Sequence, residues 1–160
     1  MRQQLELLAP ARDAEIGIAA IDCGADAVYI AGPQFGARQA AGNDIGQIRA
    51  LCDYAHRYGA RIFVTLNTIL YDSELEDAYR LMLDVQEAGA DAIIVQDMAL
   101  LEMAANGIGN IKEEFRIPLH ASTQCAIRTP EHARFLESLG FSRLILEMEL
   151  SLDQIRAIRK

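Results

Sequence analysis

One short phrase recurs where the chain passes from an amphipathic segment into an apolar run. Cys23-Gly24-Ala25-Asp26-Ala27-Val28 matches Ala88-Gly89-Ala90-Asp91-Ala92-Ile93, and looser copies surround Gly59 and Gly140. Glycine at such a point is typical of a helix that ends in a left-handed residue. Four such turns in successive units predict a repeated helix–turn–strand unit, and therefore an α/β fold.

The apolar runs between the amphipathic segments are predicted to be β-strands. They are continuously apolar, as strands are when helices cover both faces of a sheet. The predicted strands are residues 5–9, 27–31, 62–66, 92–95, 117–121 and 144–146. Their spacing fits parallel strands joined by right-handed helical crossovers.

Several helix starts between these strands are marked by capping residues. Ser73-Glu74-Leu75-Glu76 and Ser151-Leu152-Asp153-Gln154 are predicted to be capping boxes. Thr129-Pro130 supplies an N-cap followed by a proline at the first helical position. One buried helical face is predicted at Ile45, Ile48, Leu51, Cys52 and Ala55.

The regular alternation favours a TIM-type (β/α)₈ barrel over a doubly wound sheet. The segment after the first strand has none of the glycines of a nucleotide-binding loop. A closed barrel needs eight strands and six are predicted, so we expect residues 1–160 to form one domain with six of the eight units. The chain ends soon after a helix starts at Ser151, which predicts a truncated protein. Its unpaired strand edges predict a homo-oligomer.

Composition and charge exclude several classes of partner. The chain is 51% apolar and 24% charged, which is typical of a globular protein. Its net charge of −8 predicts that this segment does not bind nucleic acid by itself. No run is long enough to span a membrane, and no signal peptide is predicted. Three widely spaced cysteines suit a reducing cytoplasm, where we expect the protein to act.

Polar residues follow the predicted strands, at the end where barrel enzymes build their sites. The strongest signal is the run from His120 to Gln124, which places a titratable imidazole beside hydroxyl and amide groups. In the alternative interpretation, Ser122 and Thr123 cap a turn and Gln124 is solvated. Asn67, after the third strand, is a site candidate or a turn residue.

Other candidates have equally ordinary structural explanations. The two-residue spacing of Glu147 and Glu149 predicts that they share one strand face, as an acid/base pair, a metal site or surface ion pairs. Arg38 is a candidate for binding an anion, or else a surface arginine. Cys125 is a candidate thiol or metal ligand. The chain has no Cys-x-x-Cys or His-Glu-x-x-His motif, so no metal site is predicted.

Seven segments match, in order, the opening of a known family. They are Glu6–Ala11, Gly24–Ile30, Phe35–Arg38, Val64–Thr68, Gly89–Asp97, His120–Gln124 and Glu149–Leu152. The chain resembles the N-terminal barrel region of the U32 peptidases, the collagenase-like proteases. The resemblance implies catalytic roles for His120 and Glu149. It implies substrate-binding roles for Glu6, Arg38, Asn67, Thr123 and Gln124.

The chain departs from the family pattern at two segments, Ala31-Gly32 and the loop from Asn106 to Lys112, and it lacks a third segment. Ala31-Gly32 stands where the family usually has two glycines, which weakens the expectation of close ligand approach at that turn. The family's glycine- and cysteine-containing signature would begin just beyond Lys160. Members with cluster-dependent activity hold an iron–sulfur centre with cysteines of that later region, and Cys23, Cys52 and Cys125 match none of them. We therefore expect no cofactor in this segment and an iron–sulfur cluster in the full-length protein.

These observations lead to several functional hypotheses. The first is a fragment of a U32-family peptidase that acts on a peptide or small molecule and is inactive alone. The second is a hydroxylase of RNA or of a quinone precursor that uses an iron–sulfur cluster in the full-length protein. The third is an unrelated barrel aldolase or isomerase, although neither Lys112 nor Lys160 lies on a predicted strand to form a Schiff base. The fourth is a non-enzymatic remnant that self-associates through its strand edges.

Overall fold

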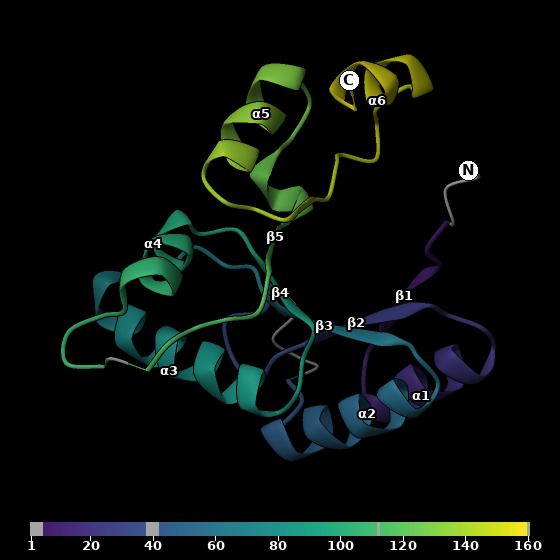
Figure 1. Cartoon of the computed structure of the whole chain (residues 1–160), viewed down its shortest axis with the longest axis vertical. Helices are drawn as coiled ribbons and strands as arrows, with labels where there is room; N and C mark the ends of the chain where they lie inside the picture. Colours follow the sequence, from purple (N-terminus) through teal and green to yellow (C-terminus); the bar gives the residue numbers. More distant parts are fainter. Residues whose placement is uncertain (1–4, 38–41, 112, 160) are drawn as a thin grey trace.

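The computed structural model describes residues 5–37, 42–111 and 113–159, in which strands and helices alternate (Figure 1). The elements are β1 (Leu8–Ala11), α1 (Ala14–Asp22), β2 (Ala27–Ala31), α2 (Ile45–Arg57), β3 (Arg61–Leu66), η2 (Asp72–Glu74), α3 (Leu75–Glu87), β4 (Ala92–Val95), α4 (Met98–Asn106), β5 (Leu119–Ala121), η3 (Thr123–Cys125), α5 (Pro130–Ser138), β6 (Arg143–Leu144) and α6 (Leu152–Ile158). None of the described helices is long and apolar enough to cross a membrane.

The six strands form one sheet in the order β1-β2-β3-β4-β5-β6. Every neighbouring pair is parallel, so α1, α2, α3, α4 and α5 lie in the crossovers between adjacent strands. A strand order without reversal is that of a barrel, whereas a doubly wound sheet reverses its order at a switch point. The predicted incomplete TIM-type barrel is therefore confirmed as an arc of six β/α units.

The two faces of the arc differ in how well they are covered. The helices lie along the outer side of the strands (Figure 1). They enclose the main apolar core, in which Val28, Ile62 and Ile93 are fully buried. On the inner face a much smaller cluster centres on Ala27, Phe63, Ala92 and Ile94. The inner face therefore has room for polar side chains, which the outer core does not.

Strand boundaries agree with the sequence prediction where the signal is local. β2 and β4 have the predicted bounds, and β3 starts one residue early. β1 begins three residues later than predicted, because Leu5 and Leu7 are 89% and 59% exposed and pairing with β2 starts at Leu8. β5 and β6 are shorter than predicted. In the part of the chain that the structure describes, β6 has a neighbour on one side only, and two of its residues pair with β5.

The predicted helix caps are confirmed at two sites and wrong at one. Thr129 and Ser151 cap α5 and α6 through their side-chain oxygens. The capping box predicted at Ser73 is wrong, because the Glu74 carboxylate accepts a hydrogen bond from the Tyr71 backbone N–H at 2.8 Å. That bond closes the short turn η2, so α3 begins only at Leu75.

The recurring glycines end helices as predicted. Gly24, Gly59, Gly89 and Gly140 have φ values of +96°, +73°, +93° and +109°. After Gly59, the Ala60 N–H donates to the Ala55 carbonyl at 3.0 Å, the long-range bond of a Schellman turn. Each turn thus reverses the chain from a helix into the next buried strand.

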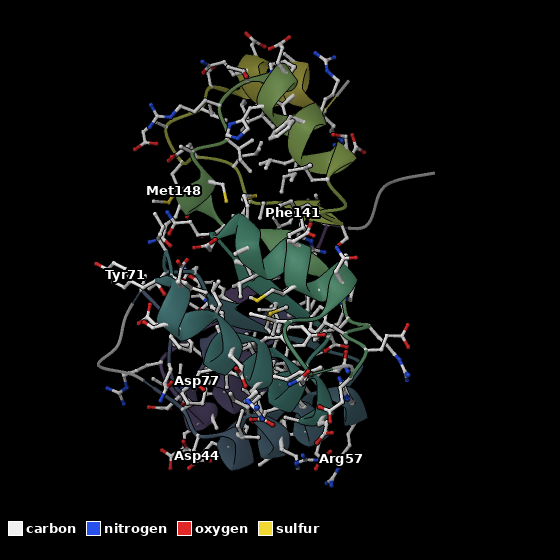
Figure 2. The ribbon with its side chains drawn as sticks, turned by 90° about the vertical axis from the view of Figure 1, so that its left-hand side faces the viewer. Asp44, Arg57, Tyr71, Asp77, Phe141 and Met148 are labelled. Atoms are coloured by element: carbon white, nitrogen blue, oxygen red, sulfur yellow. The ribbon has the colours of Figure 1, made fainter. Side chains whose placement is uncertain are left out.

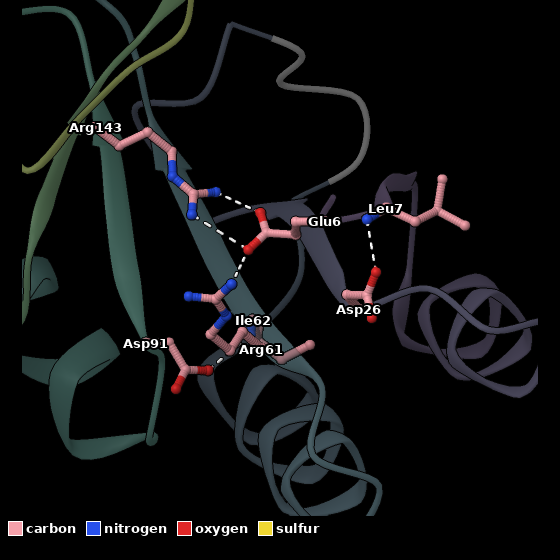
Figure 3. A network of polar contacts seen from close by, with 7 residues as sticks. All are labelled: Glu6, Leu7, Asp26, Arg61, Ile62, Asp91 and Arg143. Carbon is pink, nitrogen blue, oxygen red and sulfur yellow. Dashed lines mark hydrogen bonds and ion pairs between the residues drawn. The ribbon is translucent and has the colours of Figure 1, made fainter. Parts of the chain in front are cut away.

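The aspartate of the repeated phrase has a role of its own. The Asp26 carboxylate accepts a hydrogen bond from the Leu7 N–H at 2.7 Å, and the Asp91 carboxylate accepts one from the Ile62 N–H, also at 2.7 Å (Figure 3). In both units the aspartate before one strand holds the start of the preceding strand. The repeated Gly-Ala-Asp-Ala phrase therefore encodes strand pairing as well as helix termination.

Gly59 offers a direct test of this turn. Replacing it with alanine is expected to lower the free energy of unfolding by about 1 kcal/mol, because a side chain disfavours the left-handed region. The added Cβ would meet no atom of the described chain within 4 Å, so the loss would be conformational. Gly59→Asn should lose less, since asparagine tolerates this region better. Urea denaturation measures both, and an alanine variant as stable as wild type would contradict the assignment.

Candidate functional site

A cavity of about 330 Å³ opens at the carboxyl ends of β1, β2, β3 and β5. Its apolar lining comes from small residues at the strand ends and from Ala37. The side chains that can form hydrogen bonds or stack are Arg12, Tyr29, Thr65, Asn67, Thr123 and Gln124. The sequence predicted Asn67, Thr123 and Gln124 as site residues, and the structure brings these three together in one cavity. Arg38, also predicted, lies outside the described residues.

Asn67 connects two of the loops that form this cavity. Its Oδ1 accepts a hydrogen bond from the Ala37 N–H at 3.1 Å, and its Nδ2 lies 3.5 Å from the Ser122 hydroxyl. Ser122 in turn accepts a hydrogen bond from the Gln124 N–H at 3.2 Å as the N-cap of η3. Ser122 is thus the capping residue of the alternative interpretation, and it fixes the turn that carries Thr123 and Gln124 into the cavity.

A second asparagine, which the sequence analysis missed, joins β1 to β2. Asn43 is 3% exposed, and its Nδ2 donates to the carbonyls of Arg12 and Ala31, both at 3.1 Å. Both carbonyls belong to residues that line the cavity. The amide therefore sets the spacing of two cavity walls. In the sequence, Asn43 directly precedes Asp44, the N-cap of α2, and this position does not predict that Asn43 joins two strands.

Two loops at the carboxyl ends contain residues in the left-handed region. Phe35 has φ +57° and Ala126 has φ +55°. The Phe35 carbonyl accepts two hydrogen bonds from Thr68, one from its backbone N–H at 3.2 Å and one from its side-chain hydroxyl at 3.1 Å. These bonds hold the left-handed conformation of Phe35. Each left-handed non-glycine residue costs about 1–2 kcal/mol. Such conformations cluster at functional sites, in agreement with a site at this end of the sheet.

Exposed apolar side chains also occur on the loops at this end. Tyr71, before α3, is 78% exposed, and Met148, after β6, is 92% exposed. Figure 2 shows both labelled side chains on the same side of the molecule. The loops around the cavity therefore present apolar as well as polar groups to solvent.

His120 lies on β5 but does not line the cavity. It is 5% exposed, and its ring meets the Phe63 ring edge-on at a centroid distance of 4.8 Å. Its Nδ1 has no hydrogen-bond partner among the described residues. Burial, followed by the Arg143 and Arg61 guanidiniums, lowers the pKa of His120 from 6.5 to about 4. The imidazole is therefore neutral at pH 7, and its role as a catalytic residue stays a prediction.

Glu6 lies at the opposite end of the strands from the cavity. It precedes β1, so it sits at the amino edge of the parallel sheet. Its carboxylate accepts two hydrogen bonds from Arg143, at 2.5 Å and 3.2 Å, and forms an ion pair with Arg61 (Figure 3). Both guanidiniums also lie over the Phe63 ring, at 5.8 Å for Arg61 and 5.1 Å for Arg143. The structure thus gives Glu6 a structural partner set, away from the predicted substrate site.

Glu147 and Glu149 do not share a strand face, so that prediction is wrong. β6 ends at Leu144, and both glutamates lie beyond it. Glu147 lies 3.7 Å from Arg128, while Glu149 is exposed on a turn. Pairing with β5 stops too early to extend the strand. No contact between Glu149 and the buried His120 occurs in the described structure, so the two residues predicted as catalytic are not brought together.

The cysteines of this chain do not fit an iron–sulfur cluster. Cys23 is exposed, Cys52 is buried in α2 and Cys125 is half-buried. Burial raises the pKa of Cys52 to about 12 and also raises that of Cys125, whereas iron binds thiolates. Among the described residues no three His, Cys, Asp or Glu side chains are grouped as metal ligands would be. The described part of the chain therefore offers no set of ligands for the cluster expected in the full-length protein.

A family model describes almost the whole chain. The model of peptidase family U32 matches residues 12–160. The chain belongs to this family. The predicted resemblance is therefore confirmed, and the unrelated aldolase or isomerase is set aside.

Three curated relatives share this region with different functions. The chain is 57% identical over 157 residues to a 23S rRNA 5-hydroxycytidine C2501 synthase of Escherichia coli, covering 98% of the chain and 23% of the relative. It is 31% identical to a tRNA hydroxylation protein P1 of Bacillus subtilis, covering 97% of the chain and 36% of the relative. It is 32% identical to a collagenase of Porphyromonas gingivalis, with 97% and 36% covered. The U32 chain thus spans 23% to 36% of the length of these relatives.

A solved structure shows the same fold. The structure of a U32 peptidase superposes with a TM-score of 0.75 at 16% identity, covering 98% of this chain and 64% of that one. At that identity the match shows the fold alone.

The functional hypothesis of a peptidase fragment is corrected by these comparisons. The 57% identical relative modifies ribosomal RNA, and others in the family are named for tRNA hydroxylation. The collagenase relative is much less similar to the chain. The hydroxylase alternative is thus better supported than the peptidase, because the family's name covers proteins with different reactions.

The ion pairs of Glu6 can be tested by removing its charge. Glu6→Gln should lower the free energy of unfolding by about 2 kcal/mol, because two partly buried guanidiniums lose their shared anion. The value is below that of a fully buried pair because Arg61 and Arg143 are 48% and 33% exposed. The control is Glu76→Gln, whose exposed pair with Arg80 should leave the free energy of unfolding nearly unchanged. Equal losses in the two variants would contradict the assignment.

His120 should make stability depend on pH. Below pH 6.5 the unfolded chain protonates this imidazole while the folded chain keeps it neutral down to about pH 4. Folding should therefore lose roughly 3 kcal/mol from this group as the pH falls from 6.5 to 4, with no contribution above pH 7. Urea titrations at pH 7.5 and 4.5 should show a smaller acid loss for His120→Gln than for wild type. Parallel losses would show that His120 is not held neutral.

Proposed function

We propose that this chain is part of an enzyme that hydroxylates a pyrimidine base of RNA, and that the base is the cytosine of a cytidine in 23S ribosomal RNA. The single observation that carries the proposal is the 57% identity, over 98% of the chain, to a 23S rRNA 5-hydroxycytidine synthase. The tRNA hydroxylation relative supports the wider class of reaction. As the chain spans 23% of the rRNA-modifying relative, the activity is proposed for the whole protein.

The domain organisation belongs to the same proposal. The six units form one domain, and we place it as the N-terminal part of a larger U32 barrel. The carboxyl ends of its strands carry the cavity, which is where barrel enzymes hold their substrates. Asn67, Thr123 and Gln124 are proposed to bind the substrate there. Arg38, which lies outside the described residues, keeps its proposed role in substrate binding.

The charge of this chain bears on which part of the protein binds the RNA backbone. The chain has a net charge of −8, and phosphate contacts dominate RNA affinity. The described ion pairs also neutralise several of its arginines, among them Arg61, Arg80 and Arg143. Parts of the protein outside this chain are therefore proposed to hold the RNA backbone, while this chain contacts the base.

Hydroxylation replaces a ring C–H bond by C–OH and removes two electrons from the base. An oxygen donor and an electron acceptor are therefore required. The cysteines described above do not fit a cluster, so no step is assigned to one here. The cofactor expected for the full-length protein stays a prediction.

The proposal is tested by nucleoside analysis of ribosomal RNA. Cells without the full-length protein should lack 5-hydroxycytidine in 23S rRNA, and the restored wild-type protein should return it. Asn67→Ala should reduce the restored level about tenfold or more, because Asn67 holds two cavity loops. The matched control is Asn106→Ala, which removes an exposed contact with Glu102 at the end of α4 and should restore fully.

Protein levels and thermal midpoints of the two variants separate lost function from lost folding. Unchanged 5-hydroxycytidine in cells without the protein would contradict the proposal. So would cleavage of peptides by the purified full-length protein together with unmodified rRNA.

A further inference from the structure

The cavity at the carboxyl ends of the strands has a lining suited to one class of ligand. Tyr29 provides an aromatic wall from β2, and small apolar residues such as Pro10 and Ala31 line the space beside it. Neutral hydrogen-bonding groups come from Thr65, Asn67 and the η3 turn. A flat wall beside neutral polar groups matches a planar heterocycle with a hydrogen-bonding edge.

Several polar groups of the lining are available to a ligand. Tyr29 and Thr65 are half-buried, and Gln124 is exposed. Among the described residues, no hydrogen bond involves the Tyr29 hydroxyl, the Thr65 hydroxyl or the Gln124 side-chain amide. A buried ligand edge needs such partners, because a polar group removed from water without a hydrogen-bond partner weakens binding. These three groups can supply donors and acceptors in one place.

Hydrogen bonds from two asparagines hold the walls of the cavity in position before any ligand binds. Asn43 fixes the ends of β1 and β2 through the carbonyls of Arg12 and Ala31. Asn67 fixes the loop at Ala37 and the η3 turn through Ser122. A pocket built in this way loses little conformational entropy when it binds a small ligand.

The charge of the lining disfavours a phosphate as the occupant. Arg12 is the one cationic residue among the described lining residues. Its side chain is 73% exposed and forms an ion pair with Asp13 at 2.9 Å. Phosphate sites use several cations or helix N-termini, which give charge-assisted hydrogen bonds. The lining therefore fits the base of a nucleotide better than its phosphate.

The volume agrees with a ligand of this size. At about 330 Å³ the cavity lies near the lower limit of small-molecule sites, which span roughly 300–1,000 Å³. A folded RNA strand with stacked bases cannot enter such a space, whereas one base rotated out of the strand can.

We propose that this cavity binds a single flipped-out pyrimidine base, which stacks on Tyr29 and is read by Gln124 and Thr65. The inference rests on the proposed function, because that function supplies RNA as the polymer. It goes further by naming the pocket, the part of the substrate that enters it and the residues that recognise it. Tyr29 and Thr65 lie on strands, so their placement depends on the sheet rather than on flexible loops.

Binding of a nucleoside to the chain tests the pocket without any hydroxylation. Cytidine, followed by two-dimensional NMR, should give saturable shifts at Tyr29, Thr65 and the Gln124 amide. Tyr29→Leu keeps the apolar bulk and should weaken binding about tenfold, since stacking on an aromatic ring contributes about 1–3 kcal/mol per base. Gln124→Ala changes an exposed side chain, so the variant should fold normally and weaken binding about threefold to tenfold.

The matched control is Tyr58→Leu, which changes a 65% exposed tyrosine that ends α2 and should leave binding unchanged. Ribose 5-phosphate is the second probe and should neither shift these signals nor displace cytidine. Cytidine without saturable shifts, equal effects of Tyr58→Leu and Tyr29→Leu, or displacement by ribose 5-phosphate would each overturn the proposal.

The outcomes here and in the rRNA analysis are distinguishable. Loss of 5-hydroxycytidine in cells without the protein, combined with no cytidine binding to the cavity, would retain the RNA hydroxylase and overturn the base pocket. Cytidine binding that depends on Tyr29 and Gln124, combined with normal 5-hydroxycytidine in those cells, would support the pocket and overturn the rRNA assignment.

Discussion

The inner face of the arc is organised by one carboxylate. Glu6, which precedes the first strand, binds Arg61 on the third strand and Arg143 on the sixth, 137 residues away in sequence. The apolar cluster on this face is small, so the ion pairs of Glu6 help to stabilise it, whereas a larger apolar core stabilises the outer face. Both guanidiniums also pack on Phe63, and after burial they are the second cause of the lowered pKa of His120. The same two arginines thus connect the ends of the arc through Glu6 and contribute to the neutral state of the buried histidine.

Much of the fold could be predicted because its signals are local. The left-handed glycines, the bounds of β2 and β4 and the caps at Thr129 and Ser151 depend on neighbouring residues alone. The start of β1 could not be predicted in the same way, because exposed leucines look like strand residues until the pairing with β2 is known.

The site was predicted in part for a related reason. Asn67, Thr123 and Gln124 follow strand ends, a position that the sequence reveals. Tyr29 and Thr65 lie inside apolar runs, and sheet register decides which side chains face inward. The partners of Glu6 could not be predicted, because Arg61 and Arg143 come near it only when the strands are arranged in the sheet. The family resemblance is confirmed, and of its two functional expectations the peptidase is corrected in favour of the hydroxylase, since relatives with different reactions share this barrel region.

The aspartates of the repeated phrase have a consequence for how such a chain assembles. Asp26 and Asp91 each bond a backbone amide at the start of the strand before their own. In these two units the later strand's aspartate thus stabilises the strand made just before it, so contacts form between neighbours in sequence. Short loop closures of this kind are fast and entropically inexpensive. An arc built in this order can fold during synthesis, with the long-range contact of Glu6 and Arg143 forming last.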